Sequence, residues 1–270
     1  KMLDQFATRI ATGSDDIPAS LLQMHADILA PSLTLLFNKS LREGQFPAAM
    51  KVGKIRPLFK AGDPSQPKNY RPVSLLPIVS KVLERIVHKQ LLQYLNTNNF
   101  LPTSQFGYRH QHSTADALAL AVENINEAQA AGQHTGVAFV DMSKAFDKVK
   151  HSILVEDLFE LGLTSTALQW FSDYLMYRRQ YVETGKTRST TYDSQSGVPQ
   201  GSVLGPLLFV LYVRDIAGDL APHDVTTIQF ADDISLRASS PQPEVVSQRL
   251  TAAVQYLATW LKKRGLILNE

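Results

Sequence analysis

Hydrophobic positions along this chain change between the 3.6-residue period of helices and the short apolar runs of strands. The helical period predicts an N-terminal helical pair over 1–38, a helix over 80–95, a long helix capped by Ser113 and Thr114, and a last helix that ends near Gly265. Strand-like runs cover 55–60, 135–140, 225–230 and 234–236. The chain therefore mixes helices and strands throughout its length.

One of these runs ends in a carboxylate. The stretch 135–140 is almost continuously apolar, as in strands that are buried on both faces, and Asp141 follows it directly. Burying a neutral polar group without a hydrogen bond costs about 2–7 kcal/mol, and burying an isolated carboxylate costs more unless it is paired or binds a cation. Asp141 is therefore a candidate site residue.

A pair of carboxylates, Asp232 and Asp233, stands where two strand-like runs meet. The simplest interpretation is a hairpin whose tight turn holds both side chains at its tip. A plain surface turn is the alternative, because aspartate is a favoured turn residue. A third carboxylate brought to the same place would favour a site, since several acids close together need a cation.

Further along the chain, glycines mark a second candidate site in the loop 196–202. Gly197 and Gly201 allow the backbone to approach a ligand closely, and an apolar helix begins at Gly205 and Pro206. A flexible connector is the alternative, which the rigid proline at Pro199 disfavours. A metal site at His110 and His112 is a weaker hypothesis, because no cysteine or third ligand is nearby.

Composition adds few constraints, but the distribution of charge adds one. The 270 residues are 44% hydrophobic, contain no cysteine and carry a net charge of only +2. No apolar run reaches the roughly 18 residues of a membrane span, so a soluble protein is expected. Basic residues cluster around a single acid, Asp63; they are Lys51, Lys54, Arg56, Lys60, Lys68 and Arg71. This segment suits the binding of a polyanion, although a solvated basic loop is equally compatible with the charges.

Within that segment, Lys60 and Arg71 lie on two runs that are expected to pair as strands. On paired strands they are placed to clamp a triphosphate, Arg71 through a bidentate fork and Lys60 as a point charge. Alternatively, their aliphatic stems cover apolar surface.

Together these stretches resemble a known family. Residues 139–147, 196–206 and 230–233 are similar, in this order, to motifs A, B and C of reverse transcriptases. Two further stretches resemble the fingers motifs of the enzymes of non-LTR (LINE-like) retrotransposons. They are residues 69–75 and the stretch that begins with 105–109 and extends to Thr114. The resemblance extends from about Gly13 to the end of the chain.

The resemblance implies an α+β fold, a right-hand polymerase with an antiparallel palm sheet backed by helices. The expected domains are an N-terminal helical extension at 1–50, fingers at 51–134, and a palm at 135–270 that carries motifs A, B and C. In this family a lysine follows the residues that match Leu268 and Asn269, so the chain is expected to stop before the end of motif D, with the thumb absent.

The resemblance also assigns site residues. Asp141, Asp232 and Asp233 would be catalytic and hold two Mg²⁺ ions, for which Mn²⁺ could substitute, with Asp233 of lesser weight. Other roles follow from the same motifs: nucleotide binding by Lys60, Arg71, Phe146, Gln200 and Gly201, and template binding by Gln105, Gly107 and Arg109. Phe146 corresponds to the steric gate that excludes a 2′-hydroxyl, with an ordinary core phenylalanine as the alternative.

The implied function is RNA-directed DNA polymerisation for retrotransposition, a nucleotidyltransferase reaction that uses an RNA template, a DNA primer and dNTPs. The protein would be intracellular, in the nucleus for integration and in the cytoplasm as a ribonucleoprotein. Two alternatives stay open: an RNA-dependent RNA polymerase that shares the palm, and an inactive reverse-transcriptase-like RNA-binding protein. The sequence does not indicate an oligomeric state.

Overall fold

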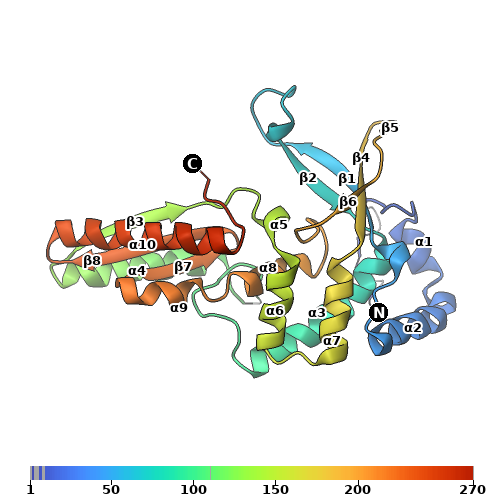
Figure 1. The fold of residues 1–270 in the computed structure, drawn as a ribbon, viewed down its shortest axis with the longest axis horizontal. Coiled ribbons are helices and arrows are strands. Elements are labelled where there is room, and N and C mark those ends of the chain that lie inside the picture. Colours follow the sequence, from blue (N-terminus) through green and yellow to red (C-terminus); the bar gives the residue numbers. More distant parts are fainter. Residues whose placement is uncertain (1, 3–5, 8–9, 110, 270) are drawn as a thin grey trace. The chain divides into compact units, whose positions relative to one another are not determined.

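The chain folds into two compact units, each built from two separate stretches. The computed structural model describes residues 2, 6–7, 10–109 and 111–269, so His110 of the weak metal hypothesis lies outside the described residues. The first unit contains Lys1–Gln93 and Leu154–Gly205, and the second contains Tyr94–Ile153 and Pro206–Glu270 (Figure 1). Within the described part of the chain, no helix has both the length and the apolar character needed to cross a membrane.

The first unit contains a five-stranded sheet. Its strands are β1 (Val52–Phe59), β2 (Tyr70–Leu75), β4 (Arg178–Thr184), β5 (Thr187–Arg188) and β6 (Tyr192–Ser194). β1 and β2 form the antiparallel pair that the sequence predicts, with Leu58 opposite Arg71. β1 also pairs in parallel with β4, which begins more than a hundred residues later in the chain.

Helices of the first unit bury an aromatic cluster. The described helices are α1 (Ala19–Met24), α2 (Ala26–Glu43), η2 (Ala48–Met50), η3 (Pro67–Asn69), α3 (Ile78–Thr97), α6 (His151–Glu160) and α7 (Ser165–Leu175). Trp170 and Tyr174 of α7 stack at 5.6 Å between ring centroids, and Phe46 meets both rings edge-on. Because Trp170 also donates from Nε1 to Ser40 of α2 at 3.0 Å, the two helices are fixed by packing and by a buried hydrogen bond.

A three-stranded antiparallel sheet, in the order β3-β8-β7, forms the centre of the second unit. The strands are β3 (His134–Val140), β7 (Thr226–Phe230) and β8 (Asp233–Ser240). The helices of this unit are α4 (Thr114–Ala130), α5 (Ala145–Lys148), α8 (Gly205–Tyr212), α9 (Ile216–Leu220), η4 (Ala221–His223) and α10 (Pro243–Lys263). The predicted capping of the long helix is confirmed, since Ser113 and Asp116 form a reciprocal capping box on α4.

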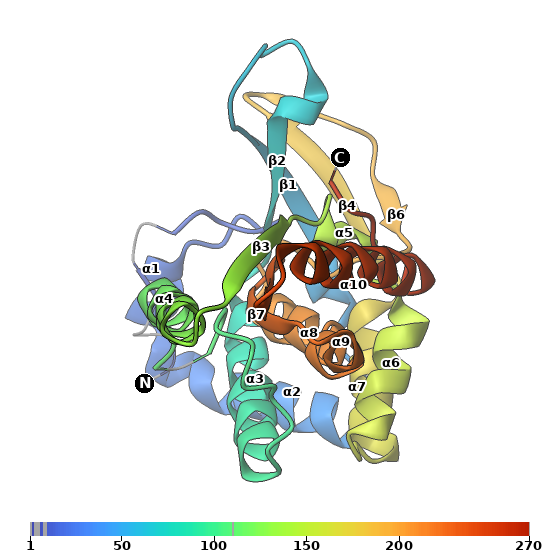
Figure 2. The same cartoon turned by 90° about the vertical axis from the view of Figure 1, so that its left-hand side faces the viewer.

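Helices lie on both faces of this sheet (Figure 2). The long helix α10 packs on one face, where a Cβ on Gly136 would lie 2.7 Å from Val246 of α10. On the other face, Arg237 of β8 donates to the carbonyl of Asn124 in α4 at 2.8 Å. Residues of β8 alternate between these faces, so Ile234 points with Leu236 and Ala238, and Asp233 points with Arg237.

The expectation that 135–140 is buried on both faces is wrong. β3 is an edge strand of the sheet, and its side chains are only half-buried or exposed. Phe139 is 86% exposed. The apolar run correctly predicted a strand that ends before Asp141, but Asp141 itself is exposed rather than buried.

Candidate active site

The turn between β7 and β8 carries the adjacent carboxylates. Phe230 pairs with Asp233, which leaves Ala231 and Asp232 as a two-residue turn, so the predicted tight hairpin is confirmed. Ala231 has a φ of +59°, a left-handed conformation that costs an alanine about 1–3 kcal/mol. Asp232 is half-buried and Asp233 is exposed at the start of β8. A strained residue that directly precedes two carboxylates is a feature typical of a functional turn.

The register of the sheet brings the third carboxylate to the same end. Val140, the last residue of β3, pairs with Ile234, so the next step of the register places Asp141 opposite Asp233. By strand alternation the two side chains share a face with Phe139. The Oδ2 atom of Asp141 accepts a hydrogen bond from the Asn269 side chain at 2.9 Å, and its carbonyl accepts one from the Asn269 N–H at 2.9 Å. All three predicted catalytic residues therefore lie at one end of one sheet.

The chemistry of these donors suits a divalent cation such as Mg²⁺, which prefers carboxylate oxygen. In the part of the chain that is described, no three acidic, histidine or cysteine side chains form a group that could already hold a metal ion. The residue types and their strand positions thus fit the ion, while the side chains are not gathered into a finished coordination site.

Gln105, which is predicted to contact a template, holds the β7–β8 turn within the second unit. Its side chain is 0% exposed. Its Oε1 atom accepts the N–H groups of Gly107 at 2.8 Å and of Ala231 at 3.0 Å, and its Nε2 atom donates to Gln229 at 3.2 Å. The buried carboxamide with these partners supports the turn, and a direct template contact by Gln105 stays a prediction.

Gly107 packs even more closely against the same turn. A Cβ at this position would lie 2.3 Å from the backbone nitrogen of Ala231, so only glycine fits. The neighbouring Arg109 is partly buried and donates to the carbonyls of Pro102 at 2.6 Å and Gln105 at 3.2 Å. Tyr108, between them, is half exposed. The segment thus supports the turn with its buried residues and presents Tyr108 to the outside.

Phe146 belongs to the short helix α5, which begins at Ala145, shortly after Asp141. Its ring stacks on Phe209 with 4.7 Å between centroids and an angle of 27°, and Tyr108 approaches it edge-on at 6.2 Å. Phe209 is fully buried while Phe146 is half-buried. One side of Phe146 therefore packs in the core, which also fixes the orientation of the ring.

The predicted triphosphate clamp lies in the first unit. Leu58 is opposite Arg71, and the N–H of Lys60 donates to the carbonyl of Asn69 at 2.9 Å, which continues the same register. Strand alternation then puts Lys60 and Arg71 on one face. Both are exposed, and neither makes an ion pair within the described residues. Arg56, two residues before Leu58, lies on the same face. The spacing of two residues between positions 56, 58 and 60 is the sequence signal that places Arg56 beside Lys60 on this face.

Gln200 and Gly201 lie at the edge of β2 in the same unit. The N–H of Ser74 donates to the carbonyl of Gln200 at 2.7 Å. Gly201 has a φ of +117°, and a Cβ there would lie 2.5 Å from the Ser74 carbonyl oxygen. The glycine is thus required twice, by its backbone conformation and by the close approach. Ser74 is three residues from Arg71, so the first unit gathers four of the predicted nucleotide-binding residues around one strand.

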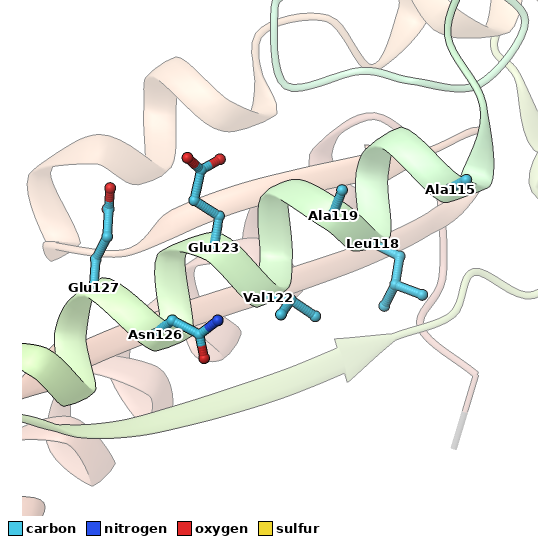
Figure 3. A pocket seen from close by; sticks show the side chains of 7 residues that line it. All are labelled: Ala115, Leu118, Ala119, Val122, Glu123, Asn126 and Glu127. Carbon is cyan, nitrogen blue, oxygen red and sulfur yellow. The ribbon is translucent and has the colours of Figure 1, made fainter.

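A hollow along α4 contains none of these residues. It is lined by Ala115, Leu118, Ala119, Val122, Glu123, Asn126 and Glu127 (Figure 3). Leu118 and Val122 project to the same side of the helix, and both are exposed. Glu123, Asn126 and Glu127 add polar groups to this hollow, but none of the predicted site residues lines it.

Comparison with known proteins decides the family. Residues 59–270 match the family described as "Reverse transcriptase (RNA-dependent DNA polymerase)". The chain belongs to the reverse transcriptase family. The carboxylates at the ends of β3 and the β7–β8 turn, and the loop beside β2, lie within the matched region of this reverse transcriptase domain.

Two similar proteins come from mobile elements of Drosophila. The chain is 33% identical over 243 residues to the "Probable RNA-directed DNA polymerase from transposon BS" of Drosophila melanogaster, covering 88% of this chain and 27% of that protein. It is 30% identical over 275 residues to the RNA-directed DNA polymerase from mobile element jockey of Drosophila funebris, covering 100% of this chain and 30% of the relative. The chain thus spans less than a third of the length of these relatives.

A solved structure supports the fold alone. The apo telomerase of Candida tropicalis, truncated from its C-terminal domain, aligns with a TM-score of 0.59 at 13% identity, over 82% of this chain and 49% of that one. The chain therefore has a reverse transcriptase and telomerase-like fold of mixed helices and sheets, which confirms the α+β prediction.

Proposed function

We propose that this chain is the core of an RNA-directed DNA polymerase that copies the RNA of a non-LTR retrotransposon. The observation that carries the proposal is the convergence of Asp141, Asp232 and Asp233 at the ends of two paired strands, in a chain of the reverse transcriptase family. The test is Mg²⁺-dependent incorporation of dNTPs on a primed RNA template, by protein expressed with its native flanking sequence.

In the proposed reaction, a primer 3′-hydroxyl attacks the α-phosphorus of a dNTP and pyrophosphate leaves. Asp141 and Asp232 would hold two Mg²⁺ ions, with Asp233 adjacent, and Mn²⁺ could occupy the same ligands. When bound, such ions supply charge neutralisation at the attacking and leaving oxygens. Phosphoryl transfer depends chiefly on position and charge, so the strand ends serve by fixing the carboxylates. Asn269 orients Asp141 through its hydrogen bond to Oδ2.

The basic face of the β1–β2 hairpin is proposed to neutralise the triphosphate. We expect Lys60→Ala and Arg71→Ala each to raise the dNTP KM by about tenfold, since each removes a charge-assisted contact worth roughly 1.5–3 kcal/mol. Steady-state kinetics on a primed RNA template measures this. Lys68→Ala, in the η3 helix of the same hairpin, is the matched control and should change KM little. Equal effects of all three substitutions would indicate a diffuse basic surface rather than a clamp.

Phe146 is proposed to lie under the sugar of the incoming nucleotide and to exclude a 2′-hydroxyl. We expect Phe146→Ala to increase the use of rNTPs relative to dNTPs by about a hundredfold, in the range that steric and polar discrimination provides. The ratio of kcat/KM for the two nucleotides measures it. Phe146→Tyr keeps the stacking ring and should retain discrimination. Strong rNTP use by the unaltered protein would favour an RNA-dependent RNA polymerase instead.

We propose that the template strand passes along the segment of Gly107 and Arg109, where the half-exposed Tyr108 can stack on a base. Gln105 contributes by holding this segment to the catalytic turn. Residues 1–50, 51–134 and 135–270 would then be N-terminal extension, fingers and palm. The protein would act inside the cell, in the nucleus at integration. Salt-sensitive RNA binding without any incorporation would indicate an inactive RNA-binding relative.

A further inference from the structure

A buried carboxylate in the first unit has no part in the reaction described so far. Glu84 lies in α3, and its side chain is 0% exposed. Its Oε1 atom accepts the hydroxyl of Ser80 at 2.9 Å. Its Oε2 atom accepts the hydroxyl of Tyr174 at 3.2 Å and the backbone N–H groups of Val203 at 2.8 Å and Leu204 at 3.2 Å. The last two groups belong to the loop that carries Gln200 and Gly201.

The partners of Glu84 all serve as donors, which is the arrangement that a charged carboxylate requires. Burial, and next the charge of Glu84, raise the pKa of the Tyr174 phenol. The phenol therefore stays protonated, and its hydroxyl donates a hydrogen bond to Glu84. Hydrogen bonds from N–H groups to a carboxylate are about twice as strong as neutral ones. A buried charge is costly unless it is fully hydrogen-bonded, and here both oxygens are satisfied. Glu84 is therefore a strong and specific anchor for the N–H groups of Val203 and Leu204.

The same loop is held on its other side by β2. The N–H of Ser74 donates to the Gln200 carbonyl at 2.7 Å, and Gly201 lies against the Ser74 carbonyl. Gln200 and Gly201 are thus attached directly to a strand edge, and the residues that follow them in the loop are attached to a buried carboxylate. If the attachment to Glu84 were lost, Val203 and Leu204 would be free to move while the bond from Ser74 remained. Gln200 would then be held from the β2 side alone, and its side chain would be less precisely positioned.

We propose that Glu84 is a positioning residue for the nucleotide-binding loop, and that it acts on the affinity for the nucleoside triphosphate. The inference rests on the proposed function, because it assumes that Gln200 and Gly201 bind the incoming nucleotide. Glu84 touches no substrate; it sets the loop that does. A purely structural role would lower the stability of the fold without a selective effect on nucleotide affinity.

Three substitutions separate these roles. Glu84→Met removes both acceptor oxygens at similar volume and releases the loop. Glu84→Gln keeps one oxygen for the loop, and the Ser80 hydroxyl can rotate to accept from the new amide group, so an intermediate effect is expected. Ser80→Ala is the matched control, because it removes only the bond to Oε1, the oxygen that does not contact the loop.

The measurements are amide hydrogen exchange at Val203 and Leu204, together with the dNTP KM and kcat of the protein expressed with its native flanking sequence. For Glu84→Met we expect exchange at the two amides to become roughly tenfold faster or more, and KM to rise about tenfold with kcat changed less than about threefold. Glu84→Gln should change both in the same direction by about threefold. Ser80→Ala should resemble the unaltered protein in both.

Unchanged KM in a folded Glu84→Met protein would overturn the inference, as would exchange at the two amides that stays as slow as before. If Glu84→Met does not fold, Glu84→Gln decides by the same criteria. A lack of incorporation by the unaltered protein would instead overturn the proposed function itself. The two failures are therefore distinguishable.

Discussion

Replacing Asp141 or Asp232 with asparagine is expected to reduce nucleotide incorporation by at least about a thousandfold, since each change removes a charged ligand from the site of charge neutralisation. The folded protein should be retained. Asp141 is exposed and follows the strand rather than pairing within it, and removing one of several neighbouring acids relieves repulsion. Primer extension measures the activity, and thermal unfolding measures the stability.

Two further substitutions make this test specific. Asp233→Asn should cause a smaller loss than Asp232→Asn, because Asp233 is assigned the lesser weight. Asp193→Asn changes an exposed carboxylate on β6 in the first unit and should have no effect on incorporation. Activity that survives in Asp141→Asn and Asp232→Asn would contradict the assignment of the site.

Gly107→Ala is expected to displace the β7–β8 turn, and so to reduce activity, without changing a carboxylate. The added methyl group would lie 2.3 Å from the Ala231 nitrogen, a backbone atom that cannot move aside unless the whole turn shifts. We expect a kcat loss of about a hundredfold, since small displacements of catalytic groups have effects of that order. Overpacking should also destabilise the protein by about 1–3 kcal/mol.

The matched control is Gly218→Ala in α9 of the same unit, where an added Cβ meets nothing within 4 Å. It should leave kcat unchanged and stabilise the helix by roughly 0.5–1 kcal/mol. Single-turnover kinetics and thermal unfolding of both variants check the pair. Normal kcat in Gly107→Ala would show that the segment 105–107 does not control the turn.

Local sequence signals were sufficient to predict the strand end and the turn that carry Asp141, Asp232 and Asp233. The strand that ends at Asp141, and the two short runs that meet at Asp232 and Asp233, are features of neighbouring residues, and the structure has both. Strand-like runs likewise predicted the pairing of β1 with β2, which places Arg71 on β2 and Lys60 directly after β1. These predictions succeeded because periodicity and turn chemistry act over a few residues.

What the sequence could not show depends on contacts between distant residues. Gln105 bonds to Ala231, 126 positions away, and Glu84 bonds to Val203, 119 positions away. In the sequence, Glu84 occupies a polar position of an amphipathic helix and Gln105 a turn, so neither is marked as buried. The burial of β3 was overestimated for the same reason, because composition does not tell an edge strand from a central one.

Primer extension on an RNA template most directly tests the central claim, that the carboxylates of β3 and the β7–β8 turn serve RNA-directed DNA synthesis. The unaltered protein, expressed with its native flanking sequence, should incorporate dNTPs in the presence of Mg²⁺. It should strongly prefer dNTPs to rNTPs, and the double variant Asp141→Asn, Asp232→Asn should bind the primed RNA but incorporate nothing. Normal incorporation by that double variant would contradict the account.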